Sequence, residues 1–431
     1  MSSLSVPRAG SPTLIERGRV IGAGGRGGDS LPTRVTATGI VLLPLLIPLG
    51  AGTVVGDVAV VLAIAVTLLW LGTRRDIHLP YLAPVALILL GGALGTFRSP
   101  VPLLSSLTLL QDLFLLAWAA TVANAMRTPE GVRTILRAWC TAGPLWAVAL
   151  ILGVSAVGSS VLTSTSGRAS FAFGDDNGLA LYFVVTLALV IGSRRPQHPA
   201  LRLGSIVVLL IATLLTGSLA GITGLAAGTL LVIVAMVATR VGLAPALVIA
   251  LSGFLVLGFY WLNADAIAQR ASRSSFTVVR NSIGREVQSK GSREVLSQET
   301  WKLFREGGIW GQGPAATKTL LLNSQAAYVK EAHDDWTAAL VERGVIGVLG
   351  VGLLMVAFAR RALGVIDPAR LKAGFREVMP NPAVLIGVLA ALLVYSVTHE
   401  VLHDRTAWAV LGFTAGLYGF GRIQAKEAVS A

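Results

Sequence analysis

Cysteine and charge are both scarce in this sequence. The chain of 431 residues has one cysteine, Cys140, and only 13% of its residues are charged. A single cysteine inside an apolar run excludes a disulfide framework, and the redox compartment cannot be read from it. Hydrophobic residues make up 54% of the chain, and the mean hydropathy is +0.73. A soluble domain of this length does not need so much apolar surface, so the composition predicts an integral membrane protein.

Acidic residues are also few, at 22 against 35 lysines and arginines, which gives a net charge of +13. Such an excess can indicate nucleic-acid binding. Here most basic residues fall in short breaks between apolar runs, a pattern that sets membrane topology, and we expect no nucleic-acid partner. Residues 1–36 lack the apolar core of a cleavable signal peptide and are rich in Gly, Ser, Pro and Arg. They predict a disordered basic tail on the cytoplasmic side.

Apolar runs long enough to cross a bilayer recur along the chain. They lie near 37–53, 55–73, 79–96, 104–125, 134–157, 177–193, 201–217, 219–238, 243–262, 344–360, 381–398 and 406–421. The predicted fold is therefore all-α and polytopic, with about twelve transmembrane helices. Alternating basic breaks place both termini in the cytoplasm.

This division leaves nine helices within 37–262, a large helical extracytoplasmic loop at 263–343, three helices within 344–421 and a cytoplasmic tail at 422–431. The first part of this loop has few acidic residues and many basic ones. The basic residues are Arg270, Arg273, Arg280, Arg285, Lys290 and Arg293. Guanidinium groups present a planar fork of donors that suits a diphosphate. A solvated basic face that touches anionic lipid head groups is the alternative, and the residues alone do not decide between the two.

The end of this loop contains a candidate general base, His333, which is followed by Asp334 and Asp335. Adjacent carboxylates can hold a histidine in one tautomer, and its pKa lets it take a proton near neutral pH. The alternative is a loop histidine with no role. A base together with a cationic clamp is what transfer from a lipid diphosphate requires, and guanidinium groups can neutralise the leaving diphosphate without a metal or other cofactor.

Four local patterns accompany this histidine. A helical pattern starts at Arg293, and Ile309–Pro314 reads as a turn whose glycines allow close backbone approach. A second helix is predicted from about Ser324 through His333. In the earlier segment 166–180, Asp176 or Asn177 is a natural helix cap, whereas Arg168 needs an anionic partner or solvent.

Taken in order, these motifs resemble the superfamily of O-antigen ligases, O-antigen polymerases and O-oligosaccharyltransferases. The resemblance rests on Arg168, Phe173, Asn177 and Ala180, then on Arg293, Trp301, Gly311, Gly313, Pro314, His333, Glu342, Gly344 and Gly347. Two positions depart from the family pattern. Asp334 stands where Asn, Ser or Gln is usual, and Leu219 follows Ser218 where an arginine is frequent. That second departure removes one expected phosphate-binding arginine.

The resemblance implies a membrane glycosyltransferase of the cell envelope, acting on the outer face of the cytoplasmic membrane. Its donor would be an undecaprenyl-diphosphate-linked glycan, and its acceptor a hydroxyl of a glycan, lipid or protein. The position of His333 would act as base. Arg293, with Arg168, Arg270, Arg273, Arg280 and Arg285, would bind the diphosphate. Asp334, Asp335, Glu342, His399, Glu400 and His403 are candidates to line the acceptor site.

Two other functions compete with this reading. The sequence HEVLH at 399–403 fits the zinc motif H-E-x-x-H, which on a helix places His399 and His403 on one face and makes Glu400 the base of a metalloprotease. No third ligand follows in a recognisable context. Asp112, inside an apolar run, is the residue that favours a secondary transporter, because a buried carboxylate is costly unless paired or facing water.

Overall fold

The computed structural model describes residues 30–45, 48–50, 53–72, 77–157, 176–276, 279–280, 282–284, 286–326, 329, 334–366 and 373–430. Within these residues the fold is helical apart from one small antiparallel pair of strands, β1 (Pro48–Gly50) and β2 (Thr53–Val54). The all-α class predicted from the sequence is thereby confirmed. His333, Arg168 and Arg285 lie outside the described residues.

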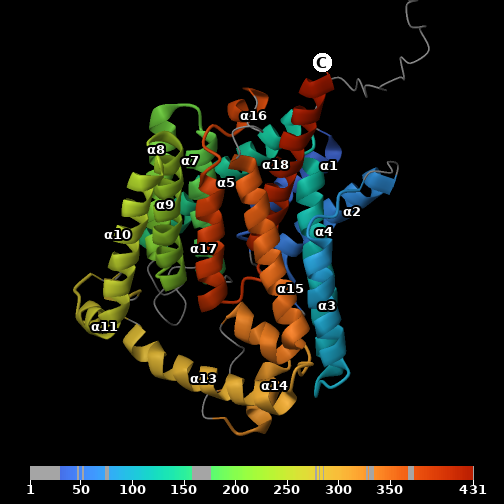
Figure 1. Cartoon of the computed structure of the whole chain (residues 1–431), viewed down its shortest axis with the longest axis vertical. Coiled ribbons are helices and arrows are strands. Elements are labelled where there is room, and N and C mark those ends of the chain that lie inside the picture. The colour runs from blue at the N-terminus through green and yellow to red at the C-terminus, as the bar shows by residue number, and fades with distance from the viewer. Residues whose placement is uncertain are drawn as a thin grey trace, which may run out of the picture.

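Most of the helices follow the apolar runs of the sequence, and Figure 1 shows how they are arranged. They are α1 (Leu31–Leu42), α2 (Val55–Gly72), α3 (Leu82–Thr96), α4 (Pro102–Ala125), α5 (Pro129–Val157), α7 (Asp176–Ser193), α8 (Pro199–Leu215), α9 (Leu219–Arg240), α10 (Leu243–Leu262), α11 (Ala264–Ser272), α13 (Glu286–Gly307), α14 (Thr317–Asn323), α15 (Asp335–Ile366), α16 (Ala373–Val378), α17 (Val384–Thr398) and α18 (Arg405–Ser430).

Six of the described helices are long and apolar enough to cross a membrane, namely α4, α5, α7, α9, α10 and α15. Shorter apolar helices are formed by α2, α3, α8 and α17. The outward faces carry large apolar side chains; on α10, Phe254, Val256 and Phe259 are all exposed. Lipid is a good solvent for such surfaces and water is not, so the chain is a multi-pass membrane protein.

The first predicted span, 37–53, is wrong. Helix α1 begins at Leu31, inside the predicted tail, and already ends at Leu42. Pro44 and Pro48 follow, and a proline removes a backbone donor and disfavours helical geometry in the residue before it. The chain instead forms the strand pair before α2. At the other end of the sequence, α18 continues past the predicted limit of 421 to Ser430.

Small residues let several helices pack backbone to backbone. Helix α3 lies along α15, and α9 lies along α17. A Cβ atom added at Gly91 of α3 would lie 2.4 Å from the carbonyl oxygen of Arg343, and one added at Gly228 of α9 would lie 2.7 Å from that of Gly387. Such contact between small residues is a usual way to join helices in a membrane. The α3 contact fixes the chain around Arg343.

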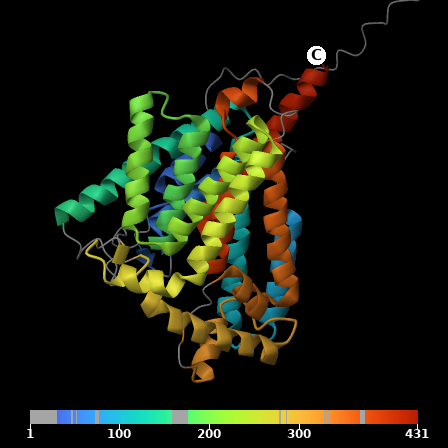
Figure 2. The same cartoon turned by 60° about the vertical axis from the view of Figure 1, so that its left-hand side comes forward.

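The helices α11, α13 and α14 gather at one end of the bundle, and α16 lies at the other (Figure 1, Figure 2). The end that carries α11, α13 and α14 is the loop end. Helix α13 crosses it and packs against both α11 and α15. It confirms the helical pattern predicted after Arg293. The predicted helix from Ser324 is wrong at its start, since Ser324–Ala326 form the turn that ends α14. Gln325 has a left-handed φ of 54°, and the N–H of Ala326 bonds the carbonyl of Leu321.

Substitution of Gly91 by alanine tests the α3–α15 contact. We expect the variant to unfold at a lower temperature, with a loss of about 1–3 kcal/mol, because the new methyl group overlaps backbone atoms that cannot move away. Gly204→Ala in α8 is the matched control, since a Cβ there meets nothing within 4 Å. Thermal unfolding in one detergent measures both; equal melting temperatures would contradict the packing argument.

Candidate functional site

The predicted turn at Ile309–Pro314 docks onto the first part of α15. The backbone N–H groups of Gln312 and Gly313 donate to the carbonyls of Val341 and Glu342 at 2.8 and 2.9 Å. The N–H of Val345 donates back to Ile309 at 3.0 Å. The glycines predicted to allow close backbone approach therefore do so.

The contact between this turn and α15 is a glycine-rich seam, and its backbone conformations require glycine. Gly311, Gly313 and Gly344 have φ values of 82°, 97° and 65°. Gly344 pairs that φ with a ψ of −167°, a region essentially restricted to glycine, and so kinks α15. A Cβ there would lie 2.2 Å from the carbonyl oxygen of Ile309. The apolar run predicted to open at Gly344 thus continues a helix that begins at Asp335.

Glu342 fastens the same turn from within the protein. Its buried carboxylate accepts hydrogen bonds from the N–H of Ala315 at 2.9 Å and from the hydroxyl of Thr317 at 2.7 Å. Both carboxylate oxygens are engaged in holding the turn. The structure places this candidate acceptor-site residue against the start of α14, where it joins α15 to the loop end.

The two aspartates that follow His333 begin α15. Asp334 caps the helix, since its Oδ1 accepts the N–H of Thr337 at 2.7 Å. Asp335 is buried, and its Oδ1 accepts the N–H groups of Val401 and Leu402 at 2.9 and 3.0 Å. Its Oδ2 is buried without a hydrogen-bond partner among the described residues. Asp335 therefore ties the start of α15 to the connection between α17 and α18.

A network of four ionisable side chains lies beside this connection. Arg343 of α15 donates to both oxygens of Asp112 on α4, with Nη1–Oδ2 at 2.5 Å and Nη2–Oδ1 at 3.3 Å. The His403 Nε2 lies 3.4 Å from Arg343 Nη2 and 3.7 Å from Asp112 Oδ1. Its Nδ1 lies 3.6 Å from Glu400 Oε2. The structure thus gathers one residue of α4, one of α15 and two of the HEVLH segment.

Arg343 was not among the residues predicted for the site. The available signal was its position between Glu342 and Gly344 at the start of an apolar run, in a chain where Asp112 needed a cationic partner. The ion pair supplies that partner, so the feature that favoured a transporter has a structural explanation.

The zinc-binding interpretation of HEVLH is not supported, because the segment is not a helix. Helix α17 ends at Thr398, and His399 has an extended conformation with φ −160° and ψ 156°. Residues 401–404 form a turn before α18. The two histidines therefore do not share a helical face. Among the residues that the structure describes, no group of three or more His, Cys, Asp or Glu is placed to hold a metal ion.

The candidate arginines that the structure describes lie at another part of the loop end. Arg270 and Arg273, at the end of α11, and Arg280 are exposed. Arg293 belongs to α13, which runs from α11 towards α15 (Figure 1). The polar network and these arginines are thus separate groups, linked by one helix.

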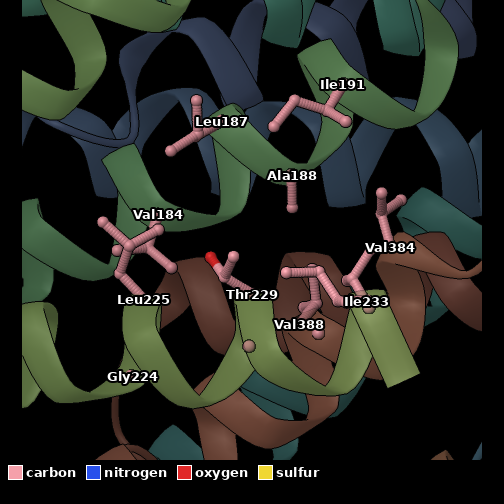
Figure 3. A pocket seen from close by; sticks show the side chains of 13 residues that line it. Val184, Leu187, Ala188, Ile191, Gly224, Leu225, Thr229, Ile233, Val384 and Val388 are labelled. Atoms are coloured by element: carbon pink, nitrogen blue, oxygen red, sulfur yellow. The ribbon is translucent and has the colours of Figure 1, made fainter. Parts of the chain in front are cut away.

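An apolar cavity of roughly 230 Å³ opens between α7, α9 and α17 (Figure 3). Leu187 and Ile191 of α7 face Ile233 of α9 and Val388 of α17 across it, with Thr229 as the one polar side chain in its lining. Gly224 and Gly228 expose the backbone of α9 at two points of this wall. Helix α17 leads from this cavity to His399 and the polar network.

Residues 204–352 match the family model described as O-antigen ligase. Over these residues the chain is similar to an O-antigen ligase domain. This confirms the resemblance to the superfamily, whose members are membrane glycan ligases and polymerases. A search of curated proteins found no match. The domain runs from α8 into α15 and contains the glycine turn, Glu342 and Arg343, whereas Asp112, Glu400 and His403 come from flanking helices and connections.

The environment of His403 raises its pKa. Burial opposes the charged form, but the Glu400 carboxylate and the charge of Asp112 outweigh burial and the repulsion from Arg343. The folded protein therefore binds this proton more tightly than the unfolded chain does. The contribution to stability is complete below the unfolded pKa of about 6.5 and is lost as the pH rises through the folded value.

Thermal unfolding as a function of pH tests this linkage. We expect the melting temperature of the wild-type protein, relative to that of His403→Asn, to decrease as the pH rises from below about 6.5 into the alkaline range. His198→Asn, at an exposed histidine before α8, should follow the wild-type curve. A wild-type curve parallel to that of His403→Asn would show that the network does not retain the proton.

The ion pair can be tested by removing one partner and then both. Asp112→Ala leaves the buried Arg343 charge uncompensated, and we expect a loss of about 3–5 kcal/mol in the free energy of unfolding. The double variant Asp112→Leu with Arg343→Leu should recover much of that loss, because no unpaired charge remains. Unfolding of the three proteins in the same detergent gives the comparison. A double variant less stable than Asp112→Ala would contradict the assignment.

Proposed function

We propose that the protein transfers a saccharide from an undecaprenyl-diphosphate-linked donor to a hydroxyl acceptor, as a ligase or polymerase of cell-envelope polysaccharide. The transfer takes place on the outer face of the cytoplasmic membrane, with both termini in the cytoplasm. The observation that carries this proposal is the O-antigen ligase domain, whose glycine turn and Glu342–Gly344 segment meet the polar network at one end of a membrane helix bundle.

In this reaction His333 is the proposed general base. It takes the proton of the acceptor hydroxyl, whose oxygen then forms a bond to the anomeric carbon of the donor sugar. The bond between that carbon and the diphosphate oxygen breaks, and polyprenyl diphosphate leaves with the electron pair. His333 directly precedes Asp334 and Asp335, and these aspartates fix the start of α15 through a helix cap and two backbone hydrogen bonds.

The leaving diphosphate needs cationic partners, and the loop end supplies arginines. Arg293 on α13 is the first candidate, together with the exposed Arg270, Arg273 and Arg280 near α11. Arg168 and Arg285 belong to the same proposal on sequence grounds. Since α13 contacts both α11 and α15, a donor bound along it would reach from the arginines to the start of α15.

The apolar cavity supports a lipid-linked donor. Its lining of aliphatic side chains and glycine backbone suits a hydrocarbon chain, and α17, which forms one wall, ends at the polar network (Figure 3). A polyprenyl chain could occupy it while the diphosphate lies at the loop end.

Replacement of His333 by alanine tests the proposed base. We expect the purified variant to bind polyprenyl-diphosphate-linked glycan as the wild type does, but to lose transfer by a factor of about 100 or more, since general base catalysis contributes at least that much. The assay compares release of polyprenyl diphosphate by the two proteins, each with and without EDTA, with His198→Asn as control. Normal turnover by His333→Ala would refute the mechanism, and loss of wild-type turnover in EDTA would refute its independence of metal.

A further inference from the structure

The side chains of Glu400 and His403 reach the surface in front of a buried ion pair. They are 25% and 29% exposed, whereas Asp112 and Arg343 behind them are 4% and 3% exposed. The network therefore has an inner layer that no ligand reaches and an outer pair that a ligand can touch. The outer pair is the part that remains to be assigned a role.

Arg343 determines how the imidazole of His403 presents itself. Its Nη2 lies 3.4 Å from His403 Nε2, and a guanidinium only donates hydrogen bonds. This contact favours a lone pair on Nε2 of the neutral ring, so the proton is on Nδ1. The Asp112 Oδ1, 3.7 Å from Nε2, balances the charge when the ring is protonated. In both charge states Nδ1 carries a proton that faces Glu400.

The gap between Nδ1 and Glu400 Oε2 fits a hydroxyl group. At 3.6 Å the two atoms are too far apart for a good hydrogen bond to each other. A hydroxyl both accepts and donates, so one placed beside the pair can accept from Nδ1–H and donate to Oε2. The geometry presents one donor and one acceptor to the same small polar group.

The charges around this pair disfavour an anionic ligand. The groups that face His403 are Asp112 from α4, Arg343 and Asp335 from α15, and Glu400 from its own connection. The one cation among them is committed to Asp112. A diphosphate would meet the partly exposed Glu400 carboxylate, whereas an uncharged sugar hydroxyl would be bound by it.

The backbone that carries the pair is held on both sides. Asp335 accepts the N–H groups of Val401 and Leu402 between the two residues. The Nε1–H of Trp408 on α18 donates to the Leu402 carbonyl at 2.6 Å. A site held this way is positioned before its ligand arrives, which lowers the entropic cost of binding.

We propose that Glu400 and His403 form the subsite that binds the acceptor hydroxyl, and that Asp112 and Arg343 are positioning residues that orient His403 within it. This inference rests on the proposed function and adds which side chains contact the acceptor. Binding there would place a sugar hydroxyl next to the connection that Asp335 joins to the start of α15.

The test separates acceptor use from donor binding. Transfer is measured in membranes of the native host from which the chromosomal copy has been removed, so that the native acceptor is present. Affinity of each purified protein for polyprenyl-diphosphate-linked glycan is measured in parallel. The variants are Glu400→Gln, His403→Ala, His403→Asn and, as a control outside the network, His198→Asn.

We expect Glu400→Gln and His403→Ala to lower the transfer rate by about tenfold to a hundredfold, the loss typical of a hydrogen bond to a charged group. Donor affinity should stay within about twofold, because neither residue contacts the donor. His403→Asn should transfer faster than His403→Ala, since its amide N–H can replace Nδ1–H, a rescue that a purely structural role would not produce. His198→Asn should equal the wild type.

Three results would overturn the subsite. These are normal transfer by Glu400→Gln, loss of donor affinity in step with transfer, and equal rates for His403→Asn and His403→Ala. Each of them leaves the proposed function standing if the wild-type protein restores transfer and binds the donor. A wild-type protein that does neither would overturn the proposed function and the subsite together.

Discussion

The ion pair between Asp112 and Arg343 is the interaction on which the arrangement of the site depends. It joins α4 to α15 through two hydrogen bonds with almost no exposure to solvent. Two charges in such a place are stable only because each neutralises the other in a bidentate geometry. The pair also orients His403 and so connects the helical bundle to the α17–α18 connection. Without it, α15 would carry an uncompensated charge at the point where three other contacts depend on its position.

The backbone makes two of those three contacts, and the Glu342 side chain makes the third. Helix α3 approaches Arg343 closely enough that Gly91 has no room for a side chain, the turn at Gly311 bonds the chain on either side of Gly344, and Glu342 closes the turn from inside. A seam of this kind gives precise placement because its hydrogen bonds and close backbone contacts fix the two segments relative to each other. The motif glycines of the O-antigen ligase domain thus act through geometry. The chemistry is left to the charged and titratable side chains that the seam positions.

The helices could be predicted because an apolar run of membrane-spanning length has few structural alternatives in lipid. The predictions fail where the lipid environment does not determine the local structure. Residues 37–53 are apolar enough to span, but Pro44 and Pro48 stop the helix. The sequence HEVLH fits the H-E-x-x-H zinc motif, which requires a helix. It instead lies in a connection where the Asp335 carboxylate accepts hydrogen bonds from the backbone N–H groups of Val401 and Leu402. The sequence shows that burying the Asp112 carboxylate without a partner would be unfavourable. It does not identify the partner, because Arg343 lies 231 residues away and no local pattern links the two.

The composition of the network bears on how such a protein selects its acceptor. The matched domain, residues 204–352, supplies Arg343, Glu342 and the glycine seam, whereas Asp112, Glu400 and His403 come from outside it. Under the proposed function, α13 and its neighbouring arginines, which belong to the domain, would handle the diphosphate common to all donors. Glu400 and His403, the partly exposed pair that suits a neutral hydroxyl, would come from the flanking part of the chain. Changes in the α17–α18 connection could then alter acceptor preference while the donor machinery stays intact, because Arg343 and Asp335 on α15 join this connection to the domain.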